Sequence, residues 1–365
     1  MYIVVSIAFL FTVVAAATLQ QAKFGKLPSG ARLERIRMSP NYNNGSFQNQ
    51  SYTPVLTEGV GFLEVSREFF FSKKVRLKPT GEIPSIKTDL IHLDRDREVL
   101  VWFGHSSYFI QIDGKRILVD PVMSGNASPF STSVKAFKGT NPFTADDIPA
   151  IDYLFISHDH WDHLDHETIM KLKPKIKKVI CGLGIGEDFE YWGFDKNIIT
   201  EMDWNEQVVL DTGFVVNAVP ARHFSGRGLK RNQTLWVSFA FKTPTMNIYI
   251  GGDGGYDKHF SEIGRTFGPF DLAILENGQY NKNWRYIHQM PEDVLKSFKD
   301  LNARRLFPVH SSKFALANHP WDEPLATITK NCRESGISLI TPMIGEPVYL
   351  KDNNQKFSRW WENVD

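Results

Sequence analysis

A ten-residue stretch, 157–166, holds four histidines and three aspartates. Imidazole and carboxylate groups are the usual zinc ligands where cysteine does not serve. His158 and His160 are two residues apart, so in an extended backbone both rings point the same way and can bind one ion. Asp162 and His163 follow a turn and can reach a second ion. The stretch therefore predicts half of a two-metal site.

Other histidines and aspartates follow, within three residues, apolar segments that we predict to be β-strands. The segments are 116–119, 153–156, 215–220, 248–250 and 306–309, and the groups that follow them are Asp120, the 157–166 stretch, His223, Asp253 and His310. Catalytic groups are often held in this way, on loops above a rigid scaffold. His223 would complete the first metal site, His310 would complete the second, and Asp253 can bridge two cations. Two metals about 4 Å apart can share a hydroxide nucleophile and stabilise an oxyanion, which favours hydrolysis.

The elements that must position these groups alternate between strands and helices. Asp113 and Gly114 lie between two apolar runs and predict a β-hairpin. Segments 167–171 and 291–298 have helical patterns, and the second has proline and acids in its first turn. This mixture predicts an α/β layered domain over residues 96–350, followed by a C-terminal tail at 351–365.

The N-terminal part of the chain has a different character. Residues 1–22 are uncharged and largely apolar, with a run of small residues near their end, and the first charged side chain is Lys23. This is typical of an export leader or a membrane anchor, although a buried strand or helix is the alternative. Residues 18–60 have turn chemistry and little periodicity, so we expect 23–95 to form an irregular arm over the domain or a linker from the membrane.

Composition excludes several classes of protein. The formal charge is +1, so nothing global favours a nucleic-acid partner. The two cysteines, Cys181 and Cys332, exclude a disulfide framework and a cysteine-rich zinc site. Aromatic residues make up 13% of the chain. This content indicates a large core, and an apolar surface that binds substrate is the alternative interpretation. Composition does not predict an oligomeric state.

The motif His158-x-His160-x-Asp162-His163 resembles the signature of the metallo-β-lactamase superfamily. The resemblance implies an αββα four-layer sandwich, in which two mixed β-sheets pack face to face between helices. A closer resemblance, over about 98–350, is to the branch of N-acylphosphatidylethanolamine-hydrolysing phospholipases D. The matching stretches are 102–105, 119–122, 127–129, 151–152, 156–158, 163–165, 251–256, His288-x-x-Pro291-Glu292, His310 and 314–318.

The resemblance implies a role for each matching residue. It assigns His158, His160 and His223 to one zinc ion, Asp162, His163 and His310 to the other, and Asp253 to a bridge between them. Asp162, Asp253 and His288 are the catalytic candidates, with His288 near the scissile phosphate; an exposed loop histidine is the alternative for His288. Asp120 would orient a ligand histidine from behind. His105 is expected beside the site, or else as a packing residue, and His166 at the surface.

The implied activity is that of a binuclear zinc phosphodiesterase that uses a metal-bound hydroxide on N-acylated phospholipids at a membrane. A lactonase or another small-substrate hydrolase on the same scaffold is the alternative, and an envelope protein that binds metal without catalysis is a third. Iron or manganese could occupy the same ligands. Ser311, Ser312 and Lys313 stand where the branch usually has Trp-Gly-Thr, so the wall beside the second metal differs.

Overall fold

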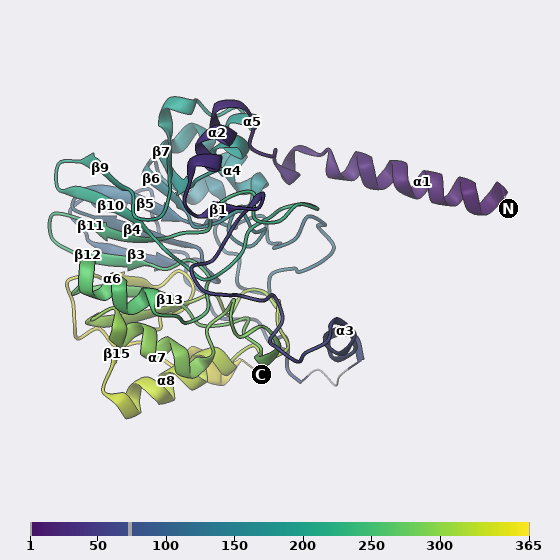
Figure 1. The fold of residues 1–365 in the computed structure, drawn as a ribbon. Coiled ribbons are helices and arrows are strands. Elements are labelled where there is room, and N and C mark those ends of the chain that lie inside the picture. The colour runs from purple at the N-terminus through teal and green to yellow at the C-terminus, as the bar shows by residue number, and fades with distance from the viewer. Residues whose placement is uncertain (1, 72–74, 365) are drawn as a thin grey trace.

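Two seven-stranded mixed β-sheets pack face to face between helices in the computed structural model (Figure 1). The structure describes residues 2–71 and 75–364. Met1 of the predicted leader, residues 72–74 of the predicted arm and Asp365 of the predicted tail lie outside the described residues. The four-layer arrangement confirms the predicted αββα sandwich.

The first sheet contains most of the N-terminal half of the domain and has the strand order β16-β3-β4-β5-β6-β7-β8. Its strands are β3 Val99–Trp102, β4 Tyr108–Ile112, β5 Lys115–Val119, β6 Ile151–Ile156, β7 Ile176–Gly182, β8 Ile199–Met202 and β16 Pro347–Tyr349. β4 and β5 are antiparallel, and Asp113 and Gly114 between them have φ values of 48° and 73°. Positive φ at both central residues is the geometry of a tight hairpin turn, so the predicted hairpin is confirmed.

The second sheet has the order β15-β14-β13-β12-β11-β10-β9. Its strands are β9 Gln207–Asp211, β10 Phe214–Val219, β11 Ser238–Lys242, β12 Asn247–Ile250, β13 Leu272–Glu276, β14 Arg305–Val309 and β15 Ser338–Leu339. Neighbours from β12 to β15 run parallel, as do neighbours from β5 to β8 in the first sheet. Parallel neighbours end at the same sheet edge, so residues that follow them are brought together.

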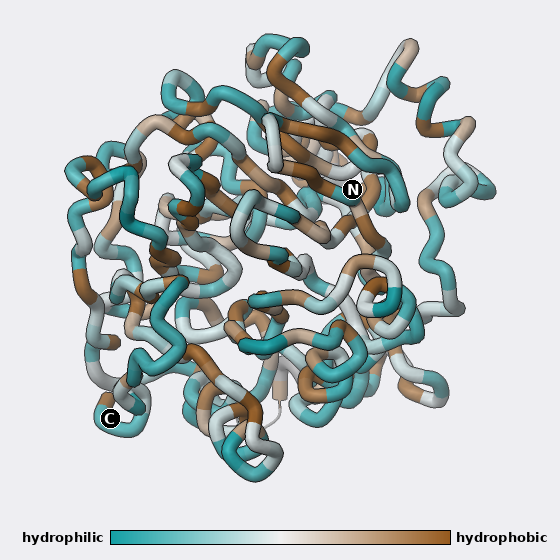
Figure 2. The backbone as a smooth tube through the Cα atoms, turned by 90° about the vertical axis from the view of Figure 1, so that its left-hand side faces the viewer, coloured by the Kyte–Doolittle hydropathy of each residue, from teal (hydrophilic) through white to brown (hydrophobic). Residues whose placement is uncertain are grey.

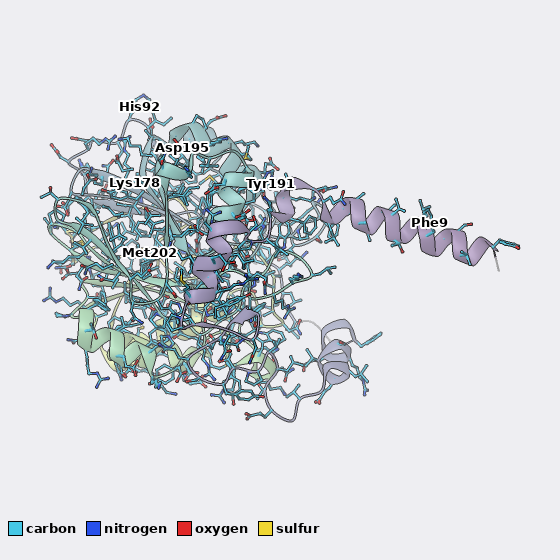
Figure 3. All side chains as sticks on the ribbon, turned by 45° about the horizontal axis from the view of Figure 1, so that its top comes forward. Phe9, His92, Lys178, Tyr191, Asp195 and Met202 are labelled. Atoms are coloured by element: carbon cyan, nitrogen blue, oxygen red, sulfur yellow. The ribbon has the colours of Figure 1, made fainter. Side chains whose placement is uncertain are left out.

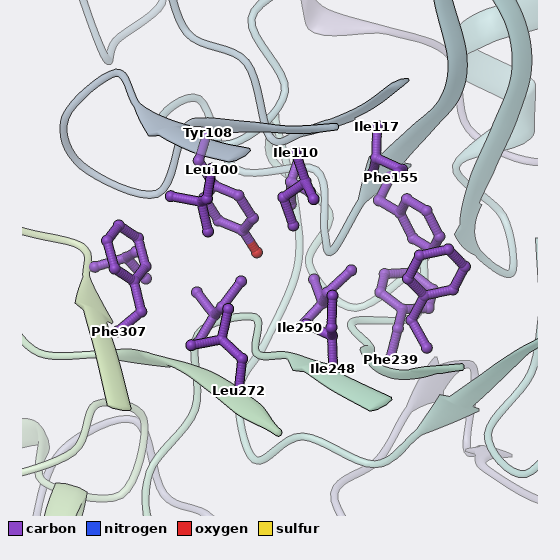
Figure 4. Close-up of a cluster of buried hydrophobic side chains, with 14 of the residues drawn as sticks. Leu100, Tyr108, Ile110, Ile117, Phe155, Phe239, Ile248, Ile250, Leu272 and Phe307 are labelled. Atoms are coloured by element: carbon purple, nitrogen blue, oxygen red, sulfur yellow. The ribbon is translucent and has the colours of Figure 1, made fainter. Parts of the chain in front are cut away.

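Alternate side chains of each strand enter different hydrophobic layers. Leu100, Tyr108 and Phe155 of the first sheet meet Phe239 and Leu272 of the second sheet in the central core (Figure 4). The intervening side chains of the first sheet pack under the outer helices α4 His166–Leu172 and α5 Gly186–Tyr191. Those of the second sheet pack under α6 His259–Phe267, α7 Pro291–Asp300 and α8 Glu323–Ser335. The apolar segments accordingly gather in the interior of the tube view (Figure 2). The helices predicted at 167–171 and 291–298 correspond to α4 and α7.

The N-terminal region is more helical than expected. It forms α1 Tyr2–Leu19, which projects away from the domain (Figure 1), then α2 Gly30–Met38, the small hairpin β1 Tyr42–Asn43 and β2 Ser46–Phe47, and α3 Phe62–Phe71. The prediction of irregular structure over 18–60 was therefore wrong at α2. Ile36 of α2 is buried in the central core, and Arg32 forms ion pairs with Glu187 and Glu201 of the first-sheet side. Tertiary contacts thus stabilise a helix that is too short and too polar to show periodicity.

Short 3-10 helices complete the chain: Ala22–Phe24, Ala145–Asp147, Lys173–Lys175, Lys196–Ile198, Lys282–Trp284 and Trp360–Asn363. Near the C-terminus, Trp360 and Trp361 are buried in the central core. Within the described ranges, no helix combines the length and the apolar character needed to cross a bilayer.

Candidate metal centre

The predicted ligands gather at one edge of the sandwich because the strands that precede them all end there. β6 ends just before the 157–166 stretch, β12 ends three residues before Asp253, and β14 ends directly before His310. His105, Asp120 and His310 have positive φ values of 53°, 41° and 69°. Such backbone is costly for residues with side chains and persists where the surroundings enforce it, typically at functional sites.

Three imidazole rings form the first group. His158 Nε2 lies 2.9 Å from His160 Nδ1, which in turn lies 3.2 Å from His223 Nε2. One nitrogen of each ring lies within 4.8 Å of the other two, so the three atoms surround a common point. These are the three residues expected to share one metal ion.

The second group contains His105, Asp162, His163 and His310, whose ligand atoms also lie within 4.8 Å of one another. His105 Nε2 is 2.9 Å from Asp162 Oδ2. The structure therefore places His105 in direct contact with a predicted ligand, closer than a packing histidine would need to be.

Asp253 lies between the two groups. Its carboxylate is 3.1 Å from His163 Nε2 and 3.1 Å from His310 Nδ1, and 3.9 Å from the Nε2 atoms of both His158 and His223. Gly251 and Gly252 precede it, and a side chain at Gly251 would meet the Ile274 carbonyl at 2.5 Å. The glycines thus allow the chain to pass close to β13 and deliver the carboxylate to the position expected of a bridge.

Outer contacts hold the rings in orientation. His163 Nδ1 is 2.8 Å from Asp120 Oδ2, and Asp120 also accepts hydrogen bonds from the Ser157 amide and hydroxyl. His223 Nδ1 is 2.8 Å from the Ile287 carbonyl, and His310 Nδ1 is 2.9 Å from Ser106 Oγ. Such contacts fix which ring nitrogen is free and are characteristic of metal sites. Among them only Asp120 was predicted, because Ser106 and Ile287 belong to no recognisable metal motif.

The donor set fits metal ions. His310 Nε2 and His105 Nδ1 are buried and have no hydrogen-bond partner among the described residues, although buried polar atoms are normally paired. Burial holds the pKa of His158, His223 and His310 well below the usual range, so these rings are neutral and can donate lone pairs. Burial alone would raise the pKa of Asp253, but the charge and the hydrogen bond of His163 outweigh it and hold this pKa well below the usual range.

His288 lies beside both groups. Its ring centroid is 5.1 Å from that of His223 and 5.2 Å from that of His310. Its Nδ1 is 2.8 Å from Oε2 of Glu276, the last residue of β13. Burial raises the pKa of Glu276 to about 7, and the carboxylate in turn raises the pKa of His288 despite the opposing effect of burial. Glu276 was missed, although it follows 272–275 as the other site residues follow their strands.

The cluster opens into a cavity of about 260 Å³. Besides the cluster residues, it is lined mainly by apolar side chains: Val55, Leu56, Phe224, Trp284, Ile287 and Leu316. Val55 and Leu56 belong to the arm, which is attached to the site where Asn49 Nδ2 donates to the His223 carbonyl at 2.7 Å. The arm therefore forms part of the site. His166, by contrast, is half-buried at the start of α4 and packs on Trp192, away from the cluster.

The wall that departs from the resembled branch is built around Lys313. Its Nζ atom is buried and donates to the Phe103 carbonyl at 3.0 Å and the Val122 carbonyl at 2.9 Å. Burial lowers the pKa of Lys313 to about 7, and a neutral amine has two N–H groups for these two acceptors. The Ser311 carbonyl accepts from the His105 amide at 3.0 Å. Positions 311–313 thus join the loops that follow β3, β5 and β14.

We predict that Lys313 makes stability depend on pH. Its folded pKa of about 7 lies below the unfolded value of about 10.4, so between these values the unfolded chain binds the extra proton. The free energy of unfolding should therefore gain up to about 1.4 kcal/mol per pH unit from this residue as pH rises from about 7 to 9. Urea denaturation at several pH values in this range should show that the free energy of unfolding rises less steeply with pH in Lys313→Met than in the unmodified protein. The exposed Lys351→Met is the control, and equal slopes in all three proteins would contradict the prediction.

Comparison with known proteins identifies the superfamily that the sequence motif resembles. A model of the beta-lactamase superfamily domain matches residues 115–311. A Mycobacterium tuberculosis protein of uncharacterised function is 36% identical over 327 residues, 88% of this chain and 87% of that protein. The N-acyl-phosphatidylethanolamine-hydrolyzing phospholipase D 1 of Caenorhabditis elegans is 30% identical over 292 residues, 73% of this chain and 79% of its own.

A solved structure shows the same fold. A metallo hydrolase of the archaeon Ignicoccus hospitalis aligns with a TM-score of 0.53 and 20% identity, over 69% of this chain and 97% of that one. The family match, the αββα sandwich and the histidine–aspartate cluster agree with one another. The chain therefore belongs to the β-lactamase superfamily, as a metal-dependent hydrolase with the metallo-β-lactamase fold.

Proposed function

We propose that the centre holds two zinc ions. His158, His160 and His223 would bind one ion, Asp162, His163 and His310 the other, and Asp253 would contact both. The nitrogen and oxygen donors suit zinc, and the division into two groups on either side of one carboxylate supports two ions rather than one. Zinc in such a centre polarises a phosphoryl oxygen and makes a water nucleophilic at neutral pH.

Metal analysis tests this assignment. Elemental analysis of dialysed protein should find two zinc ions per chain, and about one in His160→Ala, because this change removes one donor of the first group only. His92→Ala is the matched control, since His92 lies at the periphery (Figure 3) and its side chain is 82% exposed. Two ions retained in His160→Ala, or one in the unmodified chain, would contradict the assignment.

We propose that the substrate is a phosphodiester in an N-acylated phospholipid. The observation on which this rests is the cavity, which places apolar side chains directly beside the cluster and so suits a ligand with a charged group and a hydrocarbon part. The similarity to the C. elegans phospholipase D supports it. Water would add to phosphorus, the bond from phosphorus to the ethanolamine oxygen would break, and phosphatidic acid and an N-acylethanolamine would leave.

Product analysis tests the substrate. Zinc-loaded protein with vesicles containing N-acyl phosphatidylethanolamine should release phosphatidic acid, detected by mass spectrometry. Asp253→Asn should lower the rate by about 100-fold or more, because it weakens a group that touches both metal sites. Asp211→Asn, which alters an exposed carboxylate paired with Lys115, is the control. Release of no phosphatidic acid together with opening of lactones would instead favour the small-substrate hydrolase.

We propose that α1 attaches the protein to a membrane surface. Its described side chains are almost all apolar and exposed, and it projects from the domain with Phe9 far from the core (Figure 3). Val55, which lines the cavity beside the cluster, and the α3 residues Leu63 and Phe71 are exposed as well. An exposed apolar helix of this kind gains free energy by entering a lipid interface.

Vesicle binding tests this proposal. Placing charges on α1 in the double variant Phe9→Glu, Leu10→Glu should weaken co-sedimentation of the full chain with phosphatidylcholine vesicles by roughly tenfold or more, since each buried apolar side chain contributes about 1.5–3 kcal/mol. Val209→Glu is the control, because Val209 is equally exposed but lies on the edge strand β9. Unchanged binding of the double variant would show that α1 is not the attachment.

A further inference from the structure

Glu276 is a buried carboxylate at the sheet edge that forms the metal centre. β13, which it ends, lies between β12 and β14 and runs parallel to both. Since β12 leads to Asp253 and β14 to His310, Glu276 comes to the same edge between them. Its side chain is 1% exposed. An ionisable group in such a place requires specific partners to offset the cost of burial.

Both oxygens of Glu276 have partners, and both partners lie in one short loop. Oε2 is 2.8 Å from His288 Nδ1, and Oε1 accepts from the Gln289 amide at 2.6 Å. Gln289 is held in turn by Ser297 of α7, whose hydroxyl donates to Gln289 Oε1. The carboxylate therefore binds two consecutive residues of the loop that brings His288 to the cluster.

This contact determines which nitrogen of His288 faces the cavity. A carboxylate accepts, so the Nδ1 atom of His288 carries a hydrogen and donates it to Glu276. The remaining nitrogen, Nε2, belongs to a ring that lines the cavity and lies about equally far from His223 and His310. Nε2 is thus the atom available to a substrate bound at the cluster.

We propose that Glu276 is a positioning residue for His288. Its carboxylate fixes the ring with Nδ1 inward and Nε2 toward the substrate. This inference rests on the proposed hydrolase function. During hydrolysis His288 Nε2 would donate its proton to the oxygen that leaves phosphorus, and the proton released by the attacking water would restore it, so that one water is consumed overall. The arrangement follows the general logic of a carboxylate behind a catalytic imidazole.

A role as a metal ligand is the alternative for Glu276, because its ligand atom lies within 4.8 Å of ligand atoms of Asp253, His288 and His310. Four such groups could hold a cation of their own. The hydrogen bonds favour positioning, since both carboxylate oxygens already have N–H partners in the loop. Metal content distinguishes the two roles: a positioning residue leaves it unchanged, whereas a ligand does not.

Ring-nitrogen NMR tests the proposal without any substrate. In zinc-loaded protein, the His288 signals, identified by their absence in His288→Ala, should show a protonated Nδ1 in a strong hydrogen bond. Glu276→Gln should shift or remove that signal and leave two zinc ions bound. An unchanged Nδ1 signal, or a lost zinc ion, would overturn the proposal. If Glu276→Gln does not fold, Glu276→Asp, which retracts the carboxylate, should weaken the same signal.

A kinetic cycle tests the functional consequence, with whichever ester the zinc-loaded protein hydrolyses. His288→Ala should lower kcat by about 10²- to 10⁴-fold, the usual range for a general acid. Glu276→Gln should lower kcat by about 10- to 100-fold with little change in KM. In the His288→Ala background the same change should have almost no further effect, because residues that act as one unit are not additive.

A control variant shows whether the loss of kcat is specific to Glu276, and different negative results bear on the positioning role and on the substrate. Glu201→Gln removes a largely buried carboxylate, which binds Arg32 and the Gly184 and Gly186 amides on the first-sheet side, and should leave kcat unchanged. An equal loss of kcat from Glu276→Gln in both backgrounds would overturn the positioning role. Absence of phosphatidic acid release by the unmodified protein would overturn the proposed substrate instead, and the NMR result would still decide the role of Glu276.

Discussion

The contact of Asp253 with two groups of buried imidazole rings is the interaction on which the site depends. His158 and His223 lie on one side of this carboxylate, and His163 and His310 on the other, all within 4 Å. Buried rings at such distances repel one another once protonated, and their free nitrogens lose water without replacement. A central negative charge offsets part of this cost, and bound metal cations would offset the remainder. The centre is thus complementary to cations by construction.

The rest of the fold delivers groups to that carboxylate and prevents them from relaxing. Parallel strands of both sheets end at the same edge, so short loops suffice to reach it. Asp120 and the Ile287 carbonyl contact the outward Nδ1 atoms of His163 and His223, and Ser106 contacts the Nδ1 atom of His310, which also faces Asp253. The left-handed backbone at His105, Asp120 and His310 shows that packing, rather than local preference, sets these positions.

Two features beside the metal centre, the arm and Lys313, give it properties particular to this chain. The arm contributes Val55 and Leu56 to the cavity wall, so a segment distant in sequence helps to determine what the site accepts. Lys313 joins two loops by donating to the buried Phe103 and Val122 carbonyls. Ser311-Ser312-Lys313, which stands where the resembled branch usually has Trp-Gly-Thr, thus holds these loops together beside His310.

Sequence by itself predicted the α/β layered domain, the hairpin and helices α4 and α7, because each has a local signal: alternation, a turn dipeptide or helical spacing. The αββα sandwich followed from the family resemblance that the metal motif carries. Metal-ligand spacing after apolar strands also predicted seven ligand residues, which the structure gathers in one cluster. Tertiary structure alone decided the rest. α2 is stabilised by Ile36 and Arg32 through contacts with distant residues, so no local pattern shows it. Glu276, Ser106 and Asn49 are ordinary polar residues in the sequence, and their roles arise only where the folded chain brings them against His288, His310 and His223. The reason is physical: a ligand is recognisable by its own chemistry, but a residue that orients a ligand from outside any family motif, unlike Asp120, is recognisable only by its neighbour.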